Sequence, residues 1–152
     1  MSIFAFLTLS SCDAGEYDAL LNTNRAESSD CKNYDVERFG FYSTSQECIE
    51  YEYVMRSYLQ IKHINARFNC CPGEFIVESR FSGDSIIVKE TTTERNCLCV
   101  CPYDLSYQIE NVLLNRYYFK VDQGYPDGYE TLEFEIDLTK QIYGVFCVER
   151  DF

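Results

Sequence analysis

Apolar and polar side chains alternate along much of this chain, and the longest alternation covers residues 97–109. Its odd positions are thiols or large apolar groups, and from Pro102 onward its even positions are proline or polar residues. A period of two predicts a β-strand with one buried face, because successive side chains point to opposite faces of a sheet. Since Pro102 has no N–H for a strand ladder, we expect the strand to bend there or to lie at an edge. The pattern places Cys97, Cys99 and Cys101 in one row on the face that continues into the hydrophobic stripe.

Shorter alternating runs predict further strands on both sides of this one. The clearest is residues 132–138, where large apolar side chains alternate with Thr or acidic neighbours. In residues 58–71 the apolar positions change parity, which predicts a β-bulge near residues 63–65. Residues 82–85, Ser-Gly-Asp-Ser, predict a hairpin turn. With about eight strands and no helix, we predict an all-β chain that folds as a two-sheet antiparallel β-sandwich of immunoglobulin-like type, with a small closed barrel as the alternative.

The N-terminus begins with an apolar, uncharged run over residues 3–9, which leads into Leu9-Ser10-Ser11-Cys12. These residues resemble the lipobox of bacterial lipoproteins, in which the cysteine is diacylated and becomes the first residue of the mature chain. The resemblance implies that residues 1–11 are the remnant of a signal peptide and that Cys12 carries a lipid anchor. No Lys or Arg precedes the run, so we expect the true start to lie upstream. The alternative for this run is a short buried strand.

The polar composition of the following residues predicts a tether between the anchor and the domain. We therefore divide the chain into a signal peptide remnant (1–11), a lipidated Cys12 with its tether (12–30) and one β-sandwich domain (31–152). The net charge of −12, from 25 acidic and 13 basic residues, argues against nucleic acid as a partner, because that affinity depends on Lys and Arg at phosphates. It also argues against docking on an anionic membrane through a basic patch.

The nine cysteines are the strongest chemical signal in the chain. If Cys12 is lipidated, an even set remains, and an even set in an exported protein is most economically interpreted as disulfides. Neighbouring thiols within one strand have parallel Cβ directions, so we expect those of residues 97–101 to bond to other segments. Cys31 and Cys147 lie toward the two ends of the domain, where they could bond to each other. The disulfide candidates are Cys31, Cys48, Cys70, Cys71, Cys97, Cys99, Cys101 and Cys147.

The alternative to disulfides is a thiol-metal site for Zn or Cu, formed by Cys97, Cys99, Cys101, Cys70 and His63. The spacing lacks the paired Cys-x₂-Cys motifs of a zinc ribbon, and we expect no cofactor. His63 is the only histidine, and no nucleophile elbow accompanies it. We interpret it as a hydrogen-bonded structural group and predict no catalytic residues.

An acidic loop offers a second potential metal site. Asp122, Asp127 and Glu130 could bind Ca²⁺, but they lack the ligand spacing of a calcium loop, so we expect an ordinary turn over residues 125–128.

Two cysteine motifs carry a family resemblance. Phe68-Asn-Cys-Cys-Pro-Gly73 and the Cys-x-Cys-x-Cys run that begins at Cys97, behind a lipobox, resemble uncharacterised cysteine-rich lipoproteins of the Bacteroidota. The likeness covers about residues 45–125 and implies an exported β-sandwich with no assigned activity.

We therefore expect a non-enzymatic envelope lipoprotein. Its domain would be lipid-anchored at the outer membrane or cell surface, where it would bind a protein or glycan partner or serve a structural role. The alternative is an envelope thiol-metal or redox protein that uses the cysteine row.

Overall fold

The computed structural model describes residues 19–32, 45–54, 57–123 and 131–150. These residues contain ten strands and no helix, so the prediction of an all-β chain is confirmed. The strands are β1 (Ala19–Arg25), β2 (Glu27–Ser28), β3 (Gln46–Val54), β4 (Tyr58–Asn69), β5 (Phe75–Ser82), β6 (Ser85–Thr92), β7 (Val100–Glu110), β8 (Arg116–Asp122), β9 (Leu132–Asp137) and β10 (Tyr143–Glu149). The eight strands from β3 onward are those that the alternation predicts.

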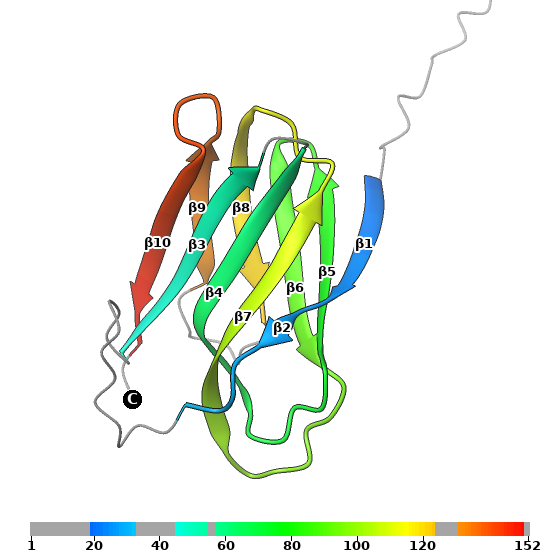
Figure 1. Cartoon of the computed structure of the whole chain (residues 1–152), viewed down its shortest axis with the longest axis vertical. Coiled ribbons are helices and arrows are strands. Elements are labelled where there is room, and N and C mark those ends of the chain that lie inside the picture. Colours follow the sequence, from blue (N-terminus) through cyan, green and yellow to red (C-terminus); the bar gives the residue numbers. More distant parts are fainter. Residues whose placement is uncertain (1–18, 33–44, 55–56, 124–130, 151–152) are drawn as a thin grey trace, which may run out of the picture.

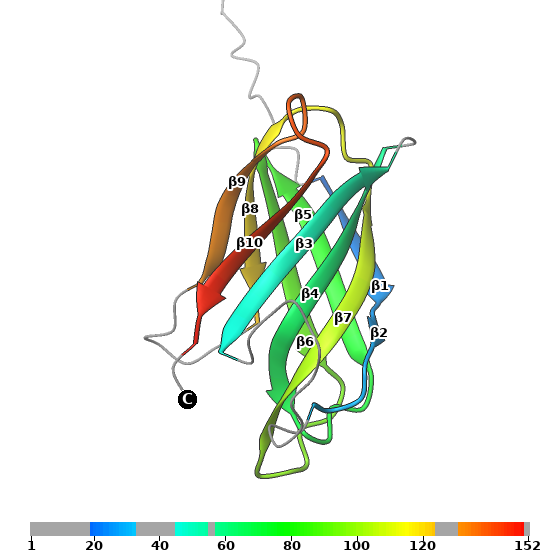
Figure 2. The same cartoon turned by 60° about the vertical axis from the view of Figure 1, so that its left-hand side comes forward.

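The strands form two five-stranded sheets, in the orders β1-β5-β6-β8-β9 and β10-β3-β4-β7-β2. The sheets pack face to face as a β-sandwich (Figure 1), and the view turned by 60° shows the second sheet in front of the first (Figure 2). Among the described strands, only β6 and β8 pair in parallel. This parallel pair differs from the predicted antiparallel arrangement. After β6 the chain reverses and crosses to the other sheet as β7, and it then reverses again and returns as β8. β8 therefore runs in the same direction as β6.

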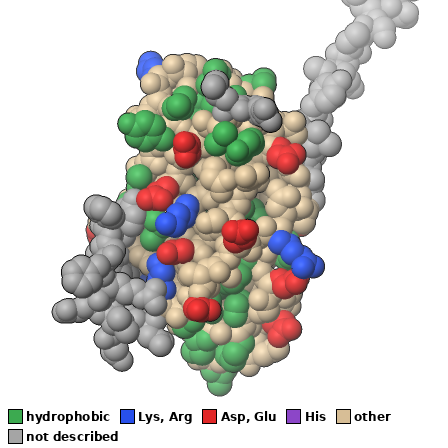
Figure 3. Space-filling view, in the orientation of Figure 1, with side chains coloured by type: hydrophobic (Ala, Val, Ile, Leu, Met, Phe, Trp, Pro, Cys, Tyr) green, Lys and Arg blue, Asp and Glu red, His purple; other side chains and the backbone are tan. Residues whose placement is uncertain are grey.

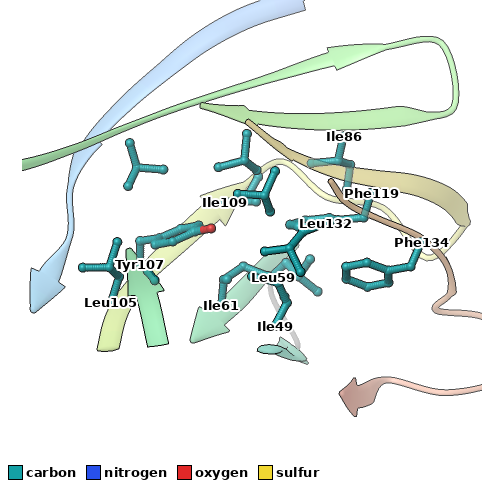
Figure 4. Packing of buried hydrophobic residues seen from close by; sticks show 14 of the residues in the cluster. Ile49, Leu59, Ile61, Ile86, Leu105, Tyr107, Ile109, Phe119, Leu132 and Phe134 are labelled. Atoms are coloured by element: carbon teal, nitrogen blue, oxygen red, sulfur yellow. The ribbon is translucent and has the colours of Figure 1, made fainter. Parts of the chain in front are cut away.

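The core lies between the sheets and is filled by the inward positions of the alternating strands. In β9, Leu132, Phe134 and Ile136 are 2%, 9% and 1% exposed, as their alternation with polar neighbours predicts. Figure 4 shows Ile49 and Leu59 of one sheet facing side chains of the other. Burial of such large apolar side chains contributes about 1.5–3 kcal/mol each, which is the main force that holds the layers together.

The predicted β-bulge is present, since the register between β4 and β7 shifts between His63 and Ala66. Asn65 has a positive φ of 60°, and its N–H donates to Oδ1 of Asp104 over 3.1 Å. Its side-chain amide donates to the carbonyl oxygen of Gln46 over 2.7 Å. The bulge changes the parity of β4, so His63 on one side of it and Ala66 on the other both face the core.

The predicted tether is wrong from Ala19 onward, and so is the predicted start of the domain at residue 31. β1 pairs with β5, and β2 pairs with β7. Both strands lie at sheet edges, where backbone hydrogen bonds suffice and polar side chains can face solvent, so no apolar stripe marks them in the sequence. The signal peptide remnant and Cys12 lie outside the described residues. None of the described residues belongs to a helix that could span a membrane.

Candidate functional site

The eight cysteines of the described residues are all paired. Cys31 is bonded to Cys101, Cys48 to Cys147, Cys70 to Cys99 and Cys71 to Cys97. The expectation that the thiols of residues 97–101 bond to other segments is confirmed. All four bonds lie toward the end of the sandwich at which β3 begins and β7 starts, the lower end in Figure 1.

Two details of the cysteine prediction are wrong. Cys97 and Cys99 precede β7, which begins at Val100, so only Cys101 of the predicted row lies on the strand. Cys147 lies directly opposite Cys48 in the register of β10 and β3, and it bonds there instead of to Cys31. Each end of the domain is therefore tied to a neighbouring strand. Cys31, in the segment after β2, is bonded to β7, and Cys147 on β10 is bonded to β3.

The disulfide pairing removes the ligands of the alternative thiol-metal site. Metals bind thiolates, and the sulfurs of Cys70, Cys97, Cys99 and Cys101 are bonded to other sulfurs. His63 lies between the sheets with two carboxylates as partners. Within the part of the chain that the structure describes, no group of three His, Cys, Asp or Glu side chains is arranged to hold a metal ion.

The densest polar chemistry of the described chain surrounds His63, between the two sheets. Its Nε2 lies 3.0 Å from Oε1 of Glu47, and its Nδ1 lies 2.8 Å from Oε2 of Glu90. His63 and Glu47 are 0% exposed and Glu90 is 1% exposed. Glu47 lies on β3 and Glu90 on β6 of the opposite sheet, so the imidazole bridges the layers.

The geometry favours a charged imidazole, because each ring nitrogen lies within hydrogen-bond distance of a carboxylate oxygen to which it can donate. Burial opposes this charge, but the carboxylate of Glu90 and the hydrogen bond to Glu47 outweigh it and raise the pKa of His63 to about 9. Burial also opposes ionisation of Glu47. The hydrogen bond and charge of His63, together with Arg150, outweigh burial and lower the pKa of Glu47 to about 2.

Three further side chains complete this group, which we call the inter-sheet cluster: Glu47, His63, Glu90, Tyr107, Gln123 and Arg150. The Nε of Arg150 donates to Oε2 of Glu47 over 2.5 Å. The Tyr107 hydroxyl donates to Oε1 of Glu90 over 2.7 Å, and the Gln123 amide donates to Oε2 of Glu90 over 3.0 Å. Two carboxylates thus face two cations, and paired, hydrogen-bonded charges are the form in which ionic groups are tolerated in a protein interior.

The prediction that His63 is hydrogen-bonded is confirmed. Sequence reasoning missed Glu47, Glu90 and Arg150. The sequence did contain a signal for these three residues. Each one continues the alternation of inward-facing apolar residues, at the end of the run that forms β3, β6 or β10. A charged residue at an inward position needs a buried partner. Three such residues, together with the single histidine, would therefore have predicted a buried group of ion pairs.

The inter-sheet cluster is closed to solvent. Its charged members are at most 4% exposed and Gln123 is 7% exposed, so a molecule in solution has no path to the imidazole or the carboxylates. The arrangement supports an ionic brace between the sheets whose strength changes with pH. It offers no surface on which a bound substrate could meet these groups.

The outer face of the β10-β3-β4-β7 sheet carries a shallow groove of about 510 Å³ that is open to solvent. Figure 3 shows this face, with acidic and basic side chains gathered near its middle. Hydrogen-bonding side chains beside an exposed aromatic ring suit a polar ligand such as a peptide or a glycan. The lining includes Glu50, Glu52, Gln60, Lys62, Ser106 and Tyr143.

The described residues include only the start of the acidic loop after β8. Asp122 is the last residue of β8 and is exposed. Asp127, Glu130 and the turn expected over residues 125–128 lie outside the described residues.

No family model, curated protein or solved structure matches this chain. Its functional assignment therefore rests on its disulfides, its inter-sheet cluster and its surface.

Proposed function

We propose that this chain is a non-enzymatic lipoprotein of the cell envelope whose disulfide-braced β-sandwich binds a partner or serves a structural role. Cys12 is the lipid anchor, and the domain stands at the outer membrane or cell surface. This assignment agrees with the resemblance to cysteine-rich lipoproteins of the Bacteroidota. Its partner is a protein or a glycan.

The cysteine pairing is the observation that carries the proposal. The sequence has nine cysteines, and eight of them form four disulfides. Disulfides persist in oxidising compartments and are rare in the cytosol, so four in one domain support export. Cys12 is the ninth, and no other cysteine of the chain is left to pair with it. It stands after an apolar run, at the position that a lipobox gives its cysteine.

The distribution of polar groups supports a binding role. His63 and Glu47, whose pKa values are both strongly shifted, are fully buried. The open groove on the β10-β3-β4-β7 face instead offers side chains that can hydrogen-bond a ligand without reacting with it. A braced sandwich with an open polar groove suits recognition, because the Cys48–Cys147 bond joins β3 to β10, two of the strands that line the groove, before the ligand arrives.

The intact mass of the protein, extracted from the envelope of the cells that make it, tests the proposal. We expect a chain that begins at Cys12 and carries acyl groups, and no alkylation of the other cysteines before reduction. Cys12→Ser is the matched variant. It should move from the membrane fraction to the soluble fraction while it keeps all four disulfides. An unmodified Cys12 behind retained residues 1–11, or several reactive thiols among the other eight, would contradict the proposal.

A further inference from the structure

Large apolar side chains gather at the end of the sandwich opposite the disulfides. Leu113 and Leu114, in the loop between β7 and β8, are 66% and 58% exposed. Ile142 and Tyr143, where the chain enters β10, are 49% and 68% exposed. Figure 1 places both loops at the upper end of the molecule, and Figure 3 shows apolar side chains there. We call these four residues the apolar end, and exposed apolar side chains gathered at one end of a molecule commonly mark an interaction site.

The apolar end is held in place by hydrogen bonds. The N–H of Leu113 donates to the Tyr117 hydroxyl over 3.1 Å, and that hydroxyl donates to the Leu113 carbonyl over 3.2 Å. The N–H of Leu138 donates to the carbonyl of Asn115 over 3.0 Å, which ties the two loops together. The N–H of Tyr53 donates to the carbonyl of Ile142 over 2.6 Å. The leucines are thus presented outward by a fixed backbone.

The chain enters the sandwich at this same end. Ala19 pairs with Phe81 next to the β5–β6 turn, and the Asp84 carbonyl of that turn accepts the N–H of Tyr118 at the start of β8. Six residues lie between Cys12 and Ala19. The seven Cα-to-Cα steps that join the two residues span at most about 3.6 Å each, or about 25 Å in all. A lipid on Cys12 therefore keeps a bilayer within about 25 Å of the start of β1.

We propose that the apolar end rests on the lipid bilayer to which Cys12 is anchored, with its four side chains in the headgroup region. The inference rests on the proposed lipidation of Cys12. Leucine and tyrosine suit this depth, because apolar groups enter the acyl boundary while the tyrosine hydroxyl stays wet. The disulfide-held loop with Leu98 then points away from the membrane.

The charges near the apolar end favour a zwitterionic bilayer. Arg116 pairs with Glu135 over 2.8 Å, and Lys140 pairs with Asp137 over 2.9 Å, so each of these cations has an acidic neighbour and the two do not form a basic patch. Asp84 on the adjacent turn adds an acidic group. An anionic surface would repel a chain of net charge −12, whereas a zwitterionic one leaves the apolar contact to decide the orientation.

The absence of tryptophan from the sequence permits a direct test. Leu114→Trp places a single fluorophore at the apolar end, and Leu98→Trp places one at the opposite end as the matched control. Both positions are exposed, so neither change disturbs the core. The chain from residue 12 to 152 contains every described residue, and its Cys12 can be coupled to a maleimide phospholipid in phosphatidylcholine vesicles.

Vesicles with and without brominated acyl chains then report contact with lipid. We expect the Leu114→Trp emission to shift to the blue and to lose about half its intensity in brominated vesicles, as for side chains that enter the acyl boundary. The Leu98→Trp emission should not change. Adding Leu113→Ser and Ile142→Ser to the Leu114→Trp variant should reduce the quenching at least about twofold, because apolar area drives the contact.

Equal quenching at both positions, or none at either, would overturn the inference. A blue shift without quenching, which grows with protein density on the vesicle, would assign the apolar end to a second copy of the chain instead. The maleimide coupling supplies the anchor chemically. Failure here is therefore distinct from failure of the proposed function, which the mass of the envelope protein decides.

Discussion

The two ends of this sandwich hold their loops by different means. Residues 93–99, before β7, contain no buried side chain, and the disulfides of Cys97 and Cys99 tie them to residues 70–71. The loop of residues 111–115 has no cysteine. It is held by Val112, which is 0% exposed, and by the hydroxyl of Tyr117. Both loops nevertheless present leucine side chains to the surface.

The difference shows what covalent bonds contribute to this fold. A loop without an apolar anchor gains nothing from the hydrophobic effect, so ordering it is opposed by the full conformational entropy of its backbone. Disulfides lower the entropy of the unfolded chain instead. The inter-sheet cluster lies toward the same end, so this half of the molecule depends on bonds and charges, whereas the opposite half depends on apolar packing.

Removing the two disulfides of the lower loop should have the largest effect. Cys70–Cys99 and Cys71–Cys97 span 29 and 26 residues and are nested, so either bond alone closes nearly the same loop. Chain entropy predicts a loss of about 2 kcal/mol for Cys→Ser changes at one pair, and about 5 kcal/mol for both. Denaturant unfolding of the two single-bond variants and the combined variant measures this. If the combined variant loses only as much stability as the two single-bond variants added together, the two disulfides do not close the same loop redundantly.

The inter-sheet cluster should make stability depend on pH. Because the folded-state pKa of His63, about 9, lies above its ordinary 6.5, its contribution is complete below pH 6.5 and is lost as the pH rises through 9. The size of the shift corresponds to about 3 kcal/mol. For Glu47, whose pKa is lowered to about 2 from 4.5, the contribution is complete above pH 4.5 and is lost as the pH falls toward 2.

Urea unfolding between about pH 6 and pH 9.5 tests the histidine part of this prediction. His63→Gln is the control. It should be less stable than the parent at pH 6 and should lose most of the slope. A parent protein whose stability does not change over this range would show that His63 is neutral in the fold, despite the two carboxylates beside it.

The apolar anchor of the upper loop can be compared directly with the exposed leucine of the lower one. Val112→Ala removes buried methyl groups and should cost about 2 kcal/mol. Leu98→Ala changes a side chain that is fully exposed and should alter stability by less than about 0.5 kcal/mol. Thermal unfolding of both variants measures the difference, and equal effects would mean that the two loops are not held differently.

The smallest effect concerns the hydroxyl that clamps the upper loop. Tyr117→Phe keeps the buried ring and removes both hydrogen bonds to Leu113, so we expect a loss of about 1 kcal/mol. Amide exchange at Leu113 should become faster, while exchange in residues 97–99 should stay unchanged. If exchange at Leu113 does not change, the hydroxyl does not hold the loop.

Much of the fold follows from local patterns. The buried face of β9 could be predicted from the period of two alone, because every second side chain of the strand points toward the opposite sheet. The bulge at Asn65 left a change of parity in the sequence, and the β5–β6 turn left Gly83, whose φ is +56°. Each of these features is written into a few consecutive residues, because backbone geometry alone links them to the structure.

Features that depend on distant segments were not predictable in this way. β1 and β2 have no apolar stripe, because edge strands are recruited by the open backbone of β5 and β7. The parallel pairing of β6 with β8 depends on the crossing of β7. Glu47, Glu90 and Arg150 carried a signal in their parity, but their meeting at His63 required both sheets to be in place.

The sequence by itself determined the all-β class, the order of eight strands and the use of cysteines as disulfides, since alternation and cysteine number are properties of short segments. Tertiary structure alone decided which cysteine meets which, because partners 26 to 99 residues apart are brought together only by sheet register. It also decided that the one histidine lies between two carboxylates. Long-range contacts of this kind depend on the packing of two layers, and no local stretch of chain encodes that packing.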